Sequence, residues 1–289
     1  MSHNSDSVAD IIELVLMCGS KNSMPQRQMH ERLTPWAITG TEFALGVNTM
    51  AKRSKTLGMA YPFEISAAAI KSSTTSLNST YAALLLMTSG TTHLPMPREQ
   101  RPKLTVCLEC VVEDCLRHLY GPQTRALRFG HPSEHGRPQG FSESVLWLGQ
   151  QLGVKVAGSL YRDPRRQDGG LDVVVWRPFP DGLEGFPILL VQATIEPKFT
   201  HKANDINARL WGLLLGLDAD PPTALAIPGT VSNRNLWEEV STRSVLLDRI
   251  RLAGLESHAP CLAAPKWDKV LGEVVVTHRR DLRRLGASE

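Results

Sequence analysis

Two short apolar runs joined by a turn are the feature that most limits what this chain can fold into. Residues 171–176 (LDVVVW) and 186–195 (FPILLVQATI) are rich in β-branched and aliphatic side chains, and the sequence Pro180-Asp181-Gly182 between them is typical of a turn. Runs this short and this apolar predict strands that are buried on both faces. Such strands lie inside a sheet that helices cover, so we expect an α/β fold.

The segments on either side of this hairpin alternate between helical and extended patterns. Residues 141–152 and 200–215 carry apolar side chains at helical spacing, whereas 154–161 and 223–227 have the length and composition of strands. The expected order from residue 141 onward is therefore α-β-β-β-α-β.

The rest of the chain has a different composition. Residues 1–120 predict a mostly helical N-terminal region, and 121–140 are dense in Gly and Pro, which is typical of a linker or surface loop. Residues 141–289 are expected to hold the α/β core followed by C-terminal helices, with a short strand near 245–247.

Charge, cysteine content and hydropathy narrow the class of protein. The formal net charge is +3, and the five cysteines are an odd number that suits reduced thiols better than a disulfide framework. The most apolar run, 81–87, is far shorter than the roughly 20 residues that a membrane span needs. Asp10 and Glu13 interrupt the apolar stretch near the N-terminus, which argues against a signal peptide. We expect a cytoplasmic protein without a membrane partner.

Polar residues stand where the two buried strands should be apolar. Asp172 opens the first strand directly after Gly169 and Gly170, and Gln192 and Thr194 interrupt the second. A buried carboxylate without a partner is costly, so Asp172 needs a hydrogen bond, a cation or a metal ion. Side chains alternate along a strand, so Gln192 and Thr194 should project to one face.

These residues also carry a resemblance to a known family. Asp168-Gly169-Gly170-Leu171-Asp172, a hairpin and then Val191-Gln192-Ala193-Thr194 resemble the motif of Mrr-like restriction endonucleases, members of the PD-(D/E)xK nuclease superfamily. The resemblance covers about residues 140–230 and includes the α-β-β-β-α-β order. It implies a restriction-endonuclease-like core between a helical N-terminal region and a C-terminal helical extension. It also implies Mg²⁺- or Mn²⁺-dependent cleavage of DNA, in restriction or antiviral defence, with partner proteins of such a system.

The resemblance assigns roles to three oxygen-bearing side chains. Asp172 and Gln192 would hold the metal ion, and Glu143 on the preceding helix matches the position of an acid that often completes such sites. Carboxylate and amide oxygens are ligands that suit a hard divalent cation.

The sequence departs from the family at the lysine, where Thr194 stands without a charge. Lys202, near the start of the following helix, is our preferred replacement. Lys198 is the alternative, because Glu196-Pro197-Lys198 matches the E-x-K triplet in a literal sense. Pro197 indicates that the strand has already ended there, which favours Gln192 and Lys202. The missing lysine also leaves open a second function, that of a catalytically silent nuclease fold which binds DNA or assembles with partner proteins.

Arginines cluster ahead of this motif. Arg162, Arg165 and Arg166 lie just before Asp168, and Arg137 precedes the helix at 141–152. We expect them to bind DNA phosphates, although a solvated basic surface would have the same composition. Sequence specificity, the choice of DNA over RNA and the oligomeric state stay open.

Two other motifs are weaker. Residues 131–135 (HPSEH) match an inverted zinc-peptidase motif, but the surrounding Gly and Pro argue against the helix that this motif requires. Cys107, Cys110 and Cys115 lie within a predicted helix, where buried thiols are the better interpretation than zinc ligands.

Overall fold

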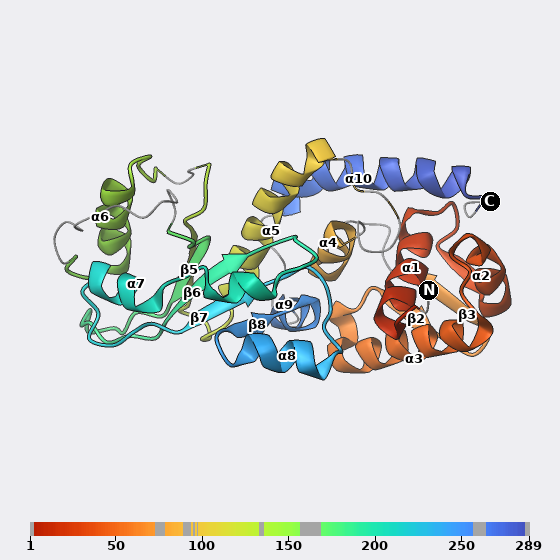
Figure 1. Cartoon of the computed structure of the whole chain (residues 1–289), viewed down its shortest axis with the longest axis horizontal. Helices are drawn as coiled ribbons and strands as arrows, with labels where there is room; N and C mark the ends of the chain where they lie inside the picture. The colour runs from red at the N-terminus through yellow and green to blue at the C-terminus, as the bar shows by residue number, and fades with distance from the viewer. Residues whose placement is uncertain are drawn as a thin grey trace. The chain divides into compact units, whose positions relative to one another are not determined.

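The computed structural model of the chain describes residues 3–72, 79–88, 94, 96, 98–132, 136–156, 169–256 and 264–286 (Figure 1). The chain forms two compact units, neither of which is a single stretch of sequence. Unit 1 comprises Met1–Leu104, Pro228–Ser232 and Asp248–Glu289, and unit 2 comprises Thr105–Ile227 and Asn233–Leu247. None of the described helices combines the length and the apolar character that a membrane span requires.

This division differs from the consecutive regions 1–120, 121–140 and 141–289 that the sequence predicts. The sheet-bearing unit begins at Thr105, within the region expected to be helical. The C-terminal helices α9 (Arg249–Glu256) and α10 (Ala264–Arg284) belong to unit 1 rather than extending the sheet-bearing core.

Unit 2 is built on a five-stranded mixed sheet in the order β4-β5-β6-β7-β8. The first three strands pair antiparallel, whereas β6, β7 and β8 run parallel. The expected α/β class is therefore confirmed, and the predicted hairpin is present as β5 and β6. The strands are β4 (Arg125–Arg128), β5 (Val173–Trp176), β6 (Ile188–Ala193), β7 (Thr223–Ala226) and β8 (Val245–Leu247).

One face of this sheet is covered by α6 (Phe141–Leu152) and α7 (Ala208–Leu214), while α8 (Arg234–Ser241) precedes β8. α6 ends at Gly153, which adopts the left-handed conformation that favours glycine at a helix end. The core between them consists of aliphatic and aromatic side chains from α6, α7, β5 and β6 and from the segments that adjoin them. Its buried members include Phe141, Val145, Leu148, Leu171, Val174, Trp176, Leu190, Ile206, Trp211 and Leu214.

The strand that borders β5 is not the one that the sequence predicts. Residues 154–156 are not extended into a strand, and 157–161 lie outside the described residues. Instead β4, from the segment expected to be a linker, pairs with β5. Two of its four residues are arginines, so the segment lacks the apolar pattern of a buried strand. Arg128 is tolerated there because its Nε lies 2.7 Å from Oε2 of Glu109, on α5 (Arg101–Leu116).

Unit 1 is mainly helical and contains a three-stranded antiparallel sheet in the order β1-β3-β2. The predicted helices near the N-terminus are present, and α1 begins where the side chain of Asn4 accepts a hydrogen bond from the Ser7 amide. The helices are α1 (Ser5–Cys18), α2 (Gln26–Arg32), α3 (Gly40–Leu57), α4 (Thr80–Met87), α9 and α10, with short 3₁₀ turns at Thr34–Trp36, Gly58–Ala60 and Arg98–Gln100. The strands are β1 (Ser23–Pro25), β2 (Phe63–Ile65) and β3 (Ala69–Ser72).

An arginine–carboxylate network (Asp6, Asp10, Glu13, Arg53 and Arg249) lies inside unit 1. Arg249 Nη1 and Nη2 donate to Asp10 Oδ1 and Oδ2 at 2.9 and 2.8 Å, and Arg53 Nη1 donates to Asp10 at 2.7 Å and to Glu13 at 3.0 Å. The hydroxyls of Tyr61 and Tyr81 also donate to Glu13. Both carboxylate oxygens of Asp10 and both of Glu13 therefore accept hydrogen bonds. The network explains why the C-terminal residues join unit 1, since it pairs Arg249 with a residue 239 positions earlier.

Candidate functional site

The candidate site lies at the edge of the unit 2 sheet where β5 begins and β6 ends. Val173 and Val191 form the last ladder pair, and Asp172 and Gln192 follow it by one residue on each strand. The Asp172 amide donates to the carbonyl of Val191 at 3.0 Å, and its carboxylate Oδ2 accepts from the amide of Ala193 at 2.7 Å. Alternation places Asp172 and Gln192 on the same face as Val174 and Leu190, toward the core beneath α6 and α7.

The two glycines before Asp172 make a tight turn against the segment that leads into α7. Gly169 and Gly170 have φ values of 59° and 81°, which favour glycine. A Cβ on Gly170 would lie 2.5 Å from the carbonyl oxygen of Asp205, so no larger residue fits there. Trp211 Nε1 donates to the Gly169 carbonyl at 3.3 Å, which fixes the turn to α7.

Gln192 brings a buried acceptor to this edge. The residue is 7% exposed, and Asp172 is 8% exposed. Among the described residues, Gln192 Oε1 has no hydrogen-bond partner. An unsatisfied buried polar group costs about 1–3 kcal/mol, and such a group calls for an explanation such as a ligand, an ion or a water molecule.

Thr194 is buried at the same edge, but its side chain is uncharged and cannot supply the positive charge of a lysine. Its hydroxyl accepts a hydrogen bond from the amide of Glu196 at 3.2 Å, and its own amide donates to the carbonyl of Ala226. The residue therefore stabilises the turn that follows β6.

Lys202 lies close to the glycine turn and is held by two acids. Its Nζ is 3.4 Å from Oε1 of Glu196 and 3.5 Å from Oδ2 of Asp205, and its side chain is 15% exposed. Asp205 is the residue that contacts Gly170, so the ammonium is tied to the turn that positions Asp172. Lys198, the alternative, is exposed in the loop beyond the end of β6.

The helix expected at 200–215 is interrupted. Thr200–Asn204 forms a 3₁₀ turn (η5), and α7 starts only at Ala208, after Asn207 caps it by accepting from the Leu210 amide at 3.0 Å. Asparagine favours a cap over a helix interior because its side chain bonds to nearby backbone amides. Lys202 is thus on a 3₁₀ turn, and not on the first turn of a long helix.

Glu143 stands in the first turn of α6 with an exposed side chain. Its carboxylate lies over Gly140, where an added Cβ would be 1.9 Å from Oε2. The start of α6 is linked to the glycine turn through Phe141, whose ring centroid lies 5.9 Å from that of Trp211. No described hydrogen bond or ion pair joins Glu143 to Asp172 or Gln192.

The arginines expected to bind phosphate divide into two groups. Arg162, Arg165 and Arg166 lie outside the described residues, as does Asp168. Arg137 is 4% exposed, and its guanidinium carbon lies 4.2 Å from the centroid of the Phe129 ring. A side chain this buried has little accessible surface with which to contact a phosphate, and its guanidinium packs on the Phe129 ring instead.

Sequence reasoning missed the buried ion pair beside Asp172. The Asp172 carbonyl accepts from the amides of Phe129 and Gly130 at 2.7 and 3.0 Å, directly after Arg128. Glu109, the partner of Arg128, is therefore the acid that α5 brings to this part of the sheet. The sequence offers no clear signal for this pair, because α5 also carries the acids Glu113 and Asp114.

The weaker motifs gain no support as metal sites. His131 lies in a bend and residues 133–135 are outside the described part of the chain. The thiols of Cys107, Cys110 and Cys115 are buried, and burial raises the pKa of Cys107 to about 11. Within the described ranges, no group of three or more His, Cys, Asp or Glu side chains is arranged to hold a metal ion.

Comparison of the chain with protein-family models, with curated proteins and with solved structures finds no match.

Proposed function

We propose that the protein is a metal-dependent nuclease that hydrolyses DNA phosphodiester bonds at the edge marked by Asp172 and Gln192. The observation that carries the proposal is the buried amide oxygen of Gln192, which lacks a partner among the described residues and stands one position beyond the last β5–β6 ladder pair, as Asp172 does. The resemblance of the surrounding motif adds the reaction class, and it alone supplies the setting of restriction or antiviral defence.

The donor set suits Mg²⁺ or Mn²⁺. Asp172 offers a carboxylate and Gln192 an amide oxygen, and Mg²⁺ in proteins commonly takes one or two carboxylates with water and substrate oxygens completing the shell. Glu143 could add a second carboxylate from α6. Once bound, the ion would supply Lewis-acid polarisation of the phosphate.

The chain's own residues would orient the metal-binding carboxylate and stabilise the negative charge on the phosphate. The amide of Ala193 holds the Asp172 carboxylate in one orientation. Lys202 would face the phosphate with an ammonium that Glu196 and Asp205 keep in place. A positioned cation of this kind stabilises charge that develops in the transition state.

The decisive experiment measures cleavage of supercoiled and linear DNA with Mg²⁺, with Mn²⁺ and with EDTA. We expect cleavage that requires the metal and that Asp172→Ala abolishes. Asp268→Ala, which removes an exposed carboxylate from α10, is the matched control and should cleave at the wild-type rate. Wild-type cleavage by Asp172→Ala would refute the site.

A second function from another class is a catalytically silent nuclease fold that binds DNA or assembles with partner proteins. Thr194 in place of lysine favours it, as does the engagement of Lys202 by two carboxylates. Under this alternative the wild-type protein retains DNA without cutting it under either metal, with any partner supplied. Salt-sensitive binding that is lost when Arg162, Arg165 and Arg166 become alanine would then be its signature.

A further inference from the structure

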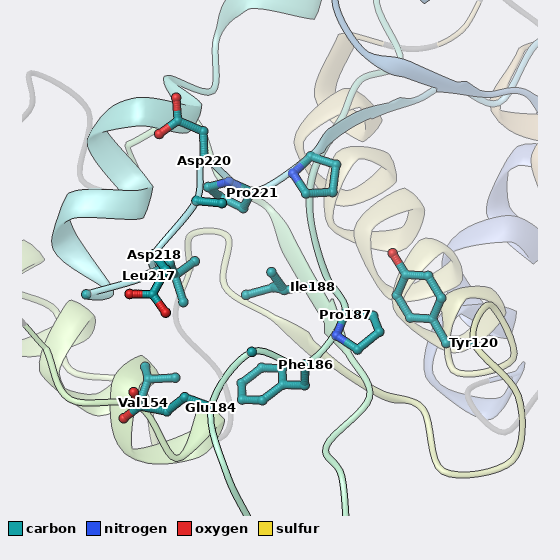
Figure 2. Close-up of a pocket in the computed structure, with 14 residues that line it drawn as sticks. Tyr120, Val154, Glu184, Phe186, Pro187, Ile188, Leu217, Asp218, Asp220 and Pro221 are labelled. Carbon is teal, nitrogen blue, oxygen red and sulfur yellow. The ribbon is translucent and has the colours of Figure 1, made fainter.

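A pocket of about 330 Å³ opens at the other end of the same sheet, within unit 2. Its floor comes from the start of β6 and from the segment that leads into β7, and Figure 2 shows Phe186, Pro187 and Ile188 grouped there. Ile188 is four residues before Gln192, which corresponds to about 13 Å of extended strand. The pocket is therefore separate from the proposed nuclease site.

The pocket has an apolar body. Val154, Phe186, Ile188, Leu217 and Pro221 contribute carbon surface to its lining. A concave, mostly apolar site with a few polar groups is the usual form of a binding pocket, and this volume is at the lower end of the ordinary range.

Two exposed apolar side chains lie in the hairpin loop that supplies part of the lining. Phe179 and Leu183, in the loop between β5 and β6, are 46% and 66% exposed. Leu183 is next to Glu184, which lines the pocket. An exposed apolar surface that adjoins a pocket is typical of a protein-interaction site.

The charged side chains that line the pocket are all acidic. Glu184, Asp218 and Asp220 line it, and in Figure 2 the carboxylates of Glu184 and Asp218 lie on the side of Val154. Asp220 is 3.3 Å from Arg209. Within the described part of the chain, the carboxylates of Glu184 and Asp218 have no hydrogen-bond or ion-pair partner. This pocket therefore repels DNA and attracts a cation.

From these features we infer that the pocket binds a peptide segment of a partner protein in which an arginine or lysine is flanked by apolar residues. The cationic head would pair with Glu184 and Asp218, and its aliphatic stem would lie on Phe186 and Ile188. Arginine pairs well with carboxylates and is enriched at interfaces. The apolar neighbours of the cation would cover the exposed hairpin, a surface that a small amine could not fill.

The test uses the full chain and fluorescence anisotropy with labelled octapeptides. The peptides share one Leu- and Pro-containing sequence and differ only at a central Arg, Gln or Glu. We expect the Arg peptide to bind at least 10-fold more tightly than the Gln peptide, and the Glu peptide not to bind. Higher salt should weaken binding of the Arg peptide but not of the Gln peptide, because the Arg peptide gains its extra affinity from electrostatic attraction.

The protein variants locate the site. The double variant Glu184→Gln/Asp218→Asn should weaken binding of the Arg peptide at least 10-fold and leave the Gln peptide unchanged. Glu239→Gln, an exposed acid on α8, is the matched control and should change neither. Leu183→Ser should weaken both peptides.

Four results would overturn the inference. The Arg peptide could bind the double variant as well as the wild type, or it could fail to bind the wild type at all. Agmatine could bind as tightly as the Arg peptide, which would make this a small-amine site. The wild type could self-associate in a way that the double variant abolishes, which would make the occupant a second copy of the chain.

Discussion

Both units bury polar side chains, and the two buried clusters differ in how completely their acceptors are paired. In unit 1, both carboxylate oxygens of Asp10 and of Glu13 accept hydrogen bonds. In unit 2, the Ala193 amide donates to the Asp172 carboxylate, and the unpaired acceptor is Gln192 Oε1, which has no partner among the described residues. A saturated cluster stabilises a fold, whereas an unsaturated one is available to a ligand.

The electrostatics follow the same division. Burial alone would raise the pKa of Asp10, but the guanidiniums of Arg249 and Arg53 outweigh it and lower that pKa below its usual value. Burial raises the pKa of Glu13, which shares these arginines with Asp10. The pairing holds Asp10 ionised and leaves no oxygen free for chemistry, so we regard this network as structural.

The largest expected effect is the loss of stability when the saturated network is broken. Asp10→Ala removes one of the two buried carboxylates that Arg249 and Arg53 share. Removing one member of a buried ion pair costs about 3–5 kcal/mol. Urea unfolding of the full chain should show this loss, and Glu31→Ala, which breaks an exposed pair with Arg27 in the same unit, should cost little. Equal losses for the two variants would contradict a structural role for the network.

The second effect is on turnover at the unsaturated site. If the protein is a nuclease, Lys202→Ala should lower the cleavage rate about 10²–10³-fold with little change in DNA binding. Lys198→Ala is the matched control, because it removes an exposed lysine four residues earlier. Thr194→Lys, which places the ammonium at the family position, should restore part of the activity to Lys202→Ala. An inactive Lys198→Ala beside an active Lys202→Ala would move the motif to Glu196 and Lys198.

A third effect tests an unsaturated group inside unit 1. His278 on α10 is fully buried, and neither ring nitrogen has a partner among the described residues. Burial lowers its pKa to about 4, although Asp281 opposes the shift. In the unfolded chain the imidazole has its ordinary pKa of 6.5. The neutral, buried imidazole therefore contributes fully to the free energy of unfolding above pH 6.5, and this contribution is lost as the pH falls toward 4.

The loss from His278 alone should reach about 3 kcal/mol at pH 4. Urea unfolding at pH 7 and at pH 4.5 measures it, with His278→Leu as the variant that cannot titrate. The wild type should lose more stability than the variant over this interval. Identical pH dependence of the two proteins would show that His278 does not titrate as its burial suggests.

The sequence predicts the elements whose pattern is local. The strands β5 and β6 and helix α6 follow from apolar runs and from the stops at Gly153 and Pro180. Strand alternation also predicts that Gln192 projects from the second strand. These features depend on neighbours a few residues away, and the structure agrees with them.

The features that the sequence does not predict depend on distant partners. β4 is missed because Arg128 is polar, and only Glu109 on another element makes its burial tolerable. The network of unit 1 is missed because it pairs Asp10 with Arg249 across nearly the whole chain. Lys202 is expected from its place in the chain. Its pairing with Glu196 and Asp205 is not predicted, because a 3₁₀ turn replaces the start of the helix expected at 200–215.

The smallest effect bears most directly on the comparison, because it concerns the unpaired oxygen itself. Gln192→Met keeps a side chain of similar volume and removes the buried acceptor. In EDTA we expect the variant to be about 1 kcal/mol more stable than the wild type, since an unsatisfied polar group is costly to bury. Gln192→Met would then raise the free energy of unfolding, whereas Asp10→Ala lowers it, which is the difference expected between an unpaired and a paired buried cluster.

A ligand that binds only the folded state stabilises it, so 10 mM Mg²⁺ or Mn²⁺ should raise the melting temperature of the wild type but not of Gln192→Met. A destabilised variant in EDTA would mean that Gln192 is a paired core residue, and equal metal responses would mean that its oxygen is not a ligand.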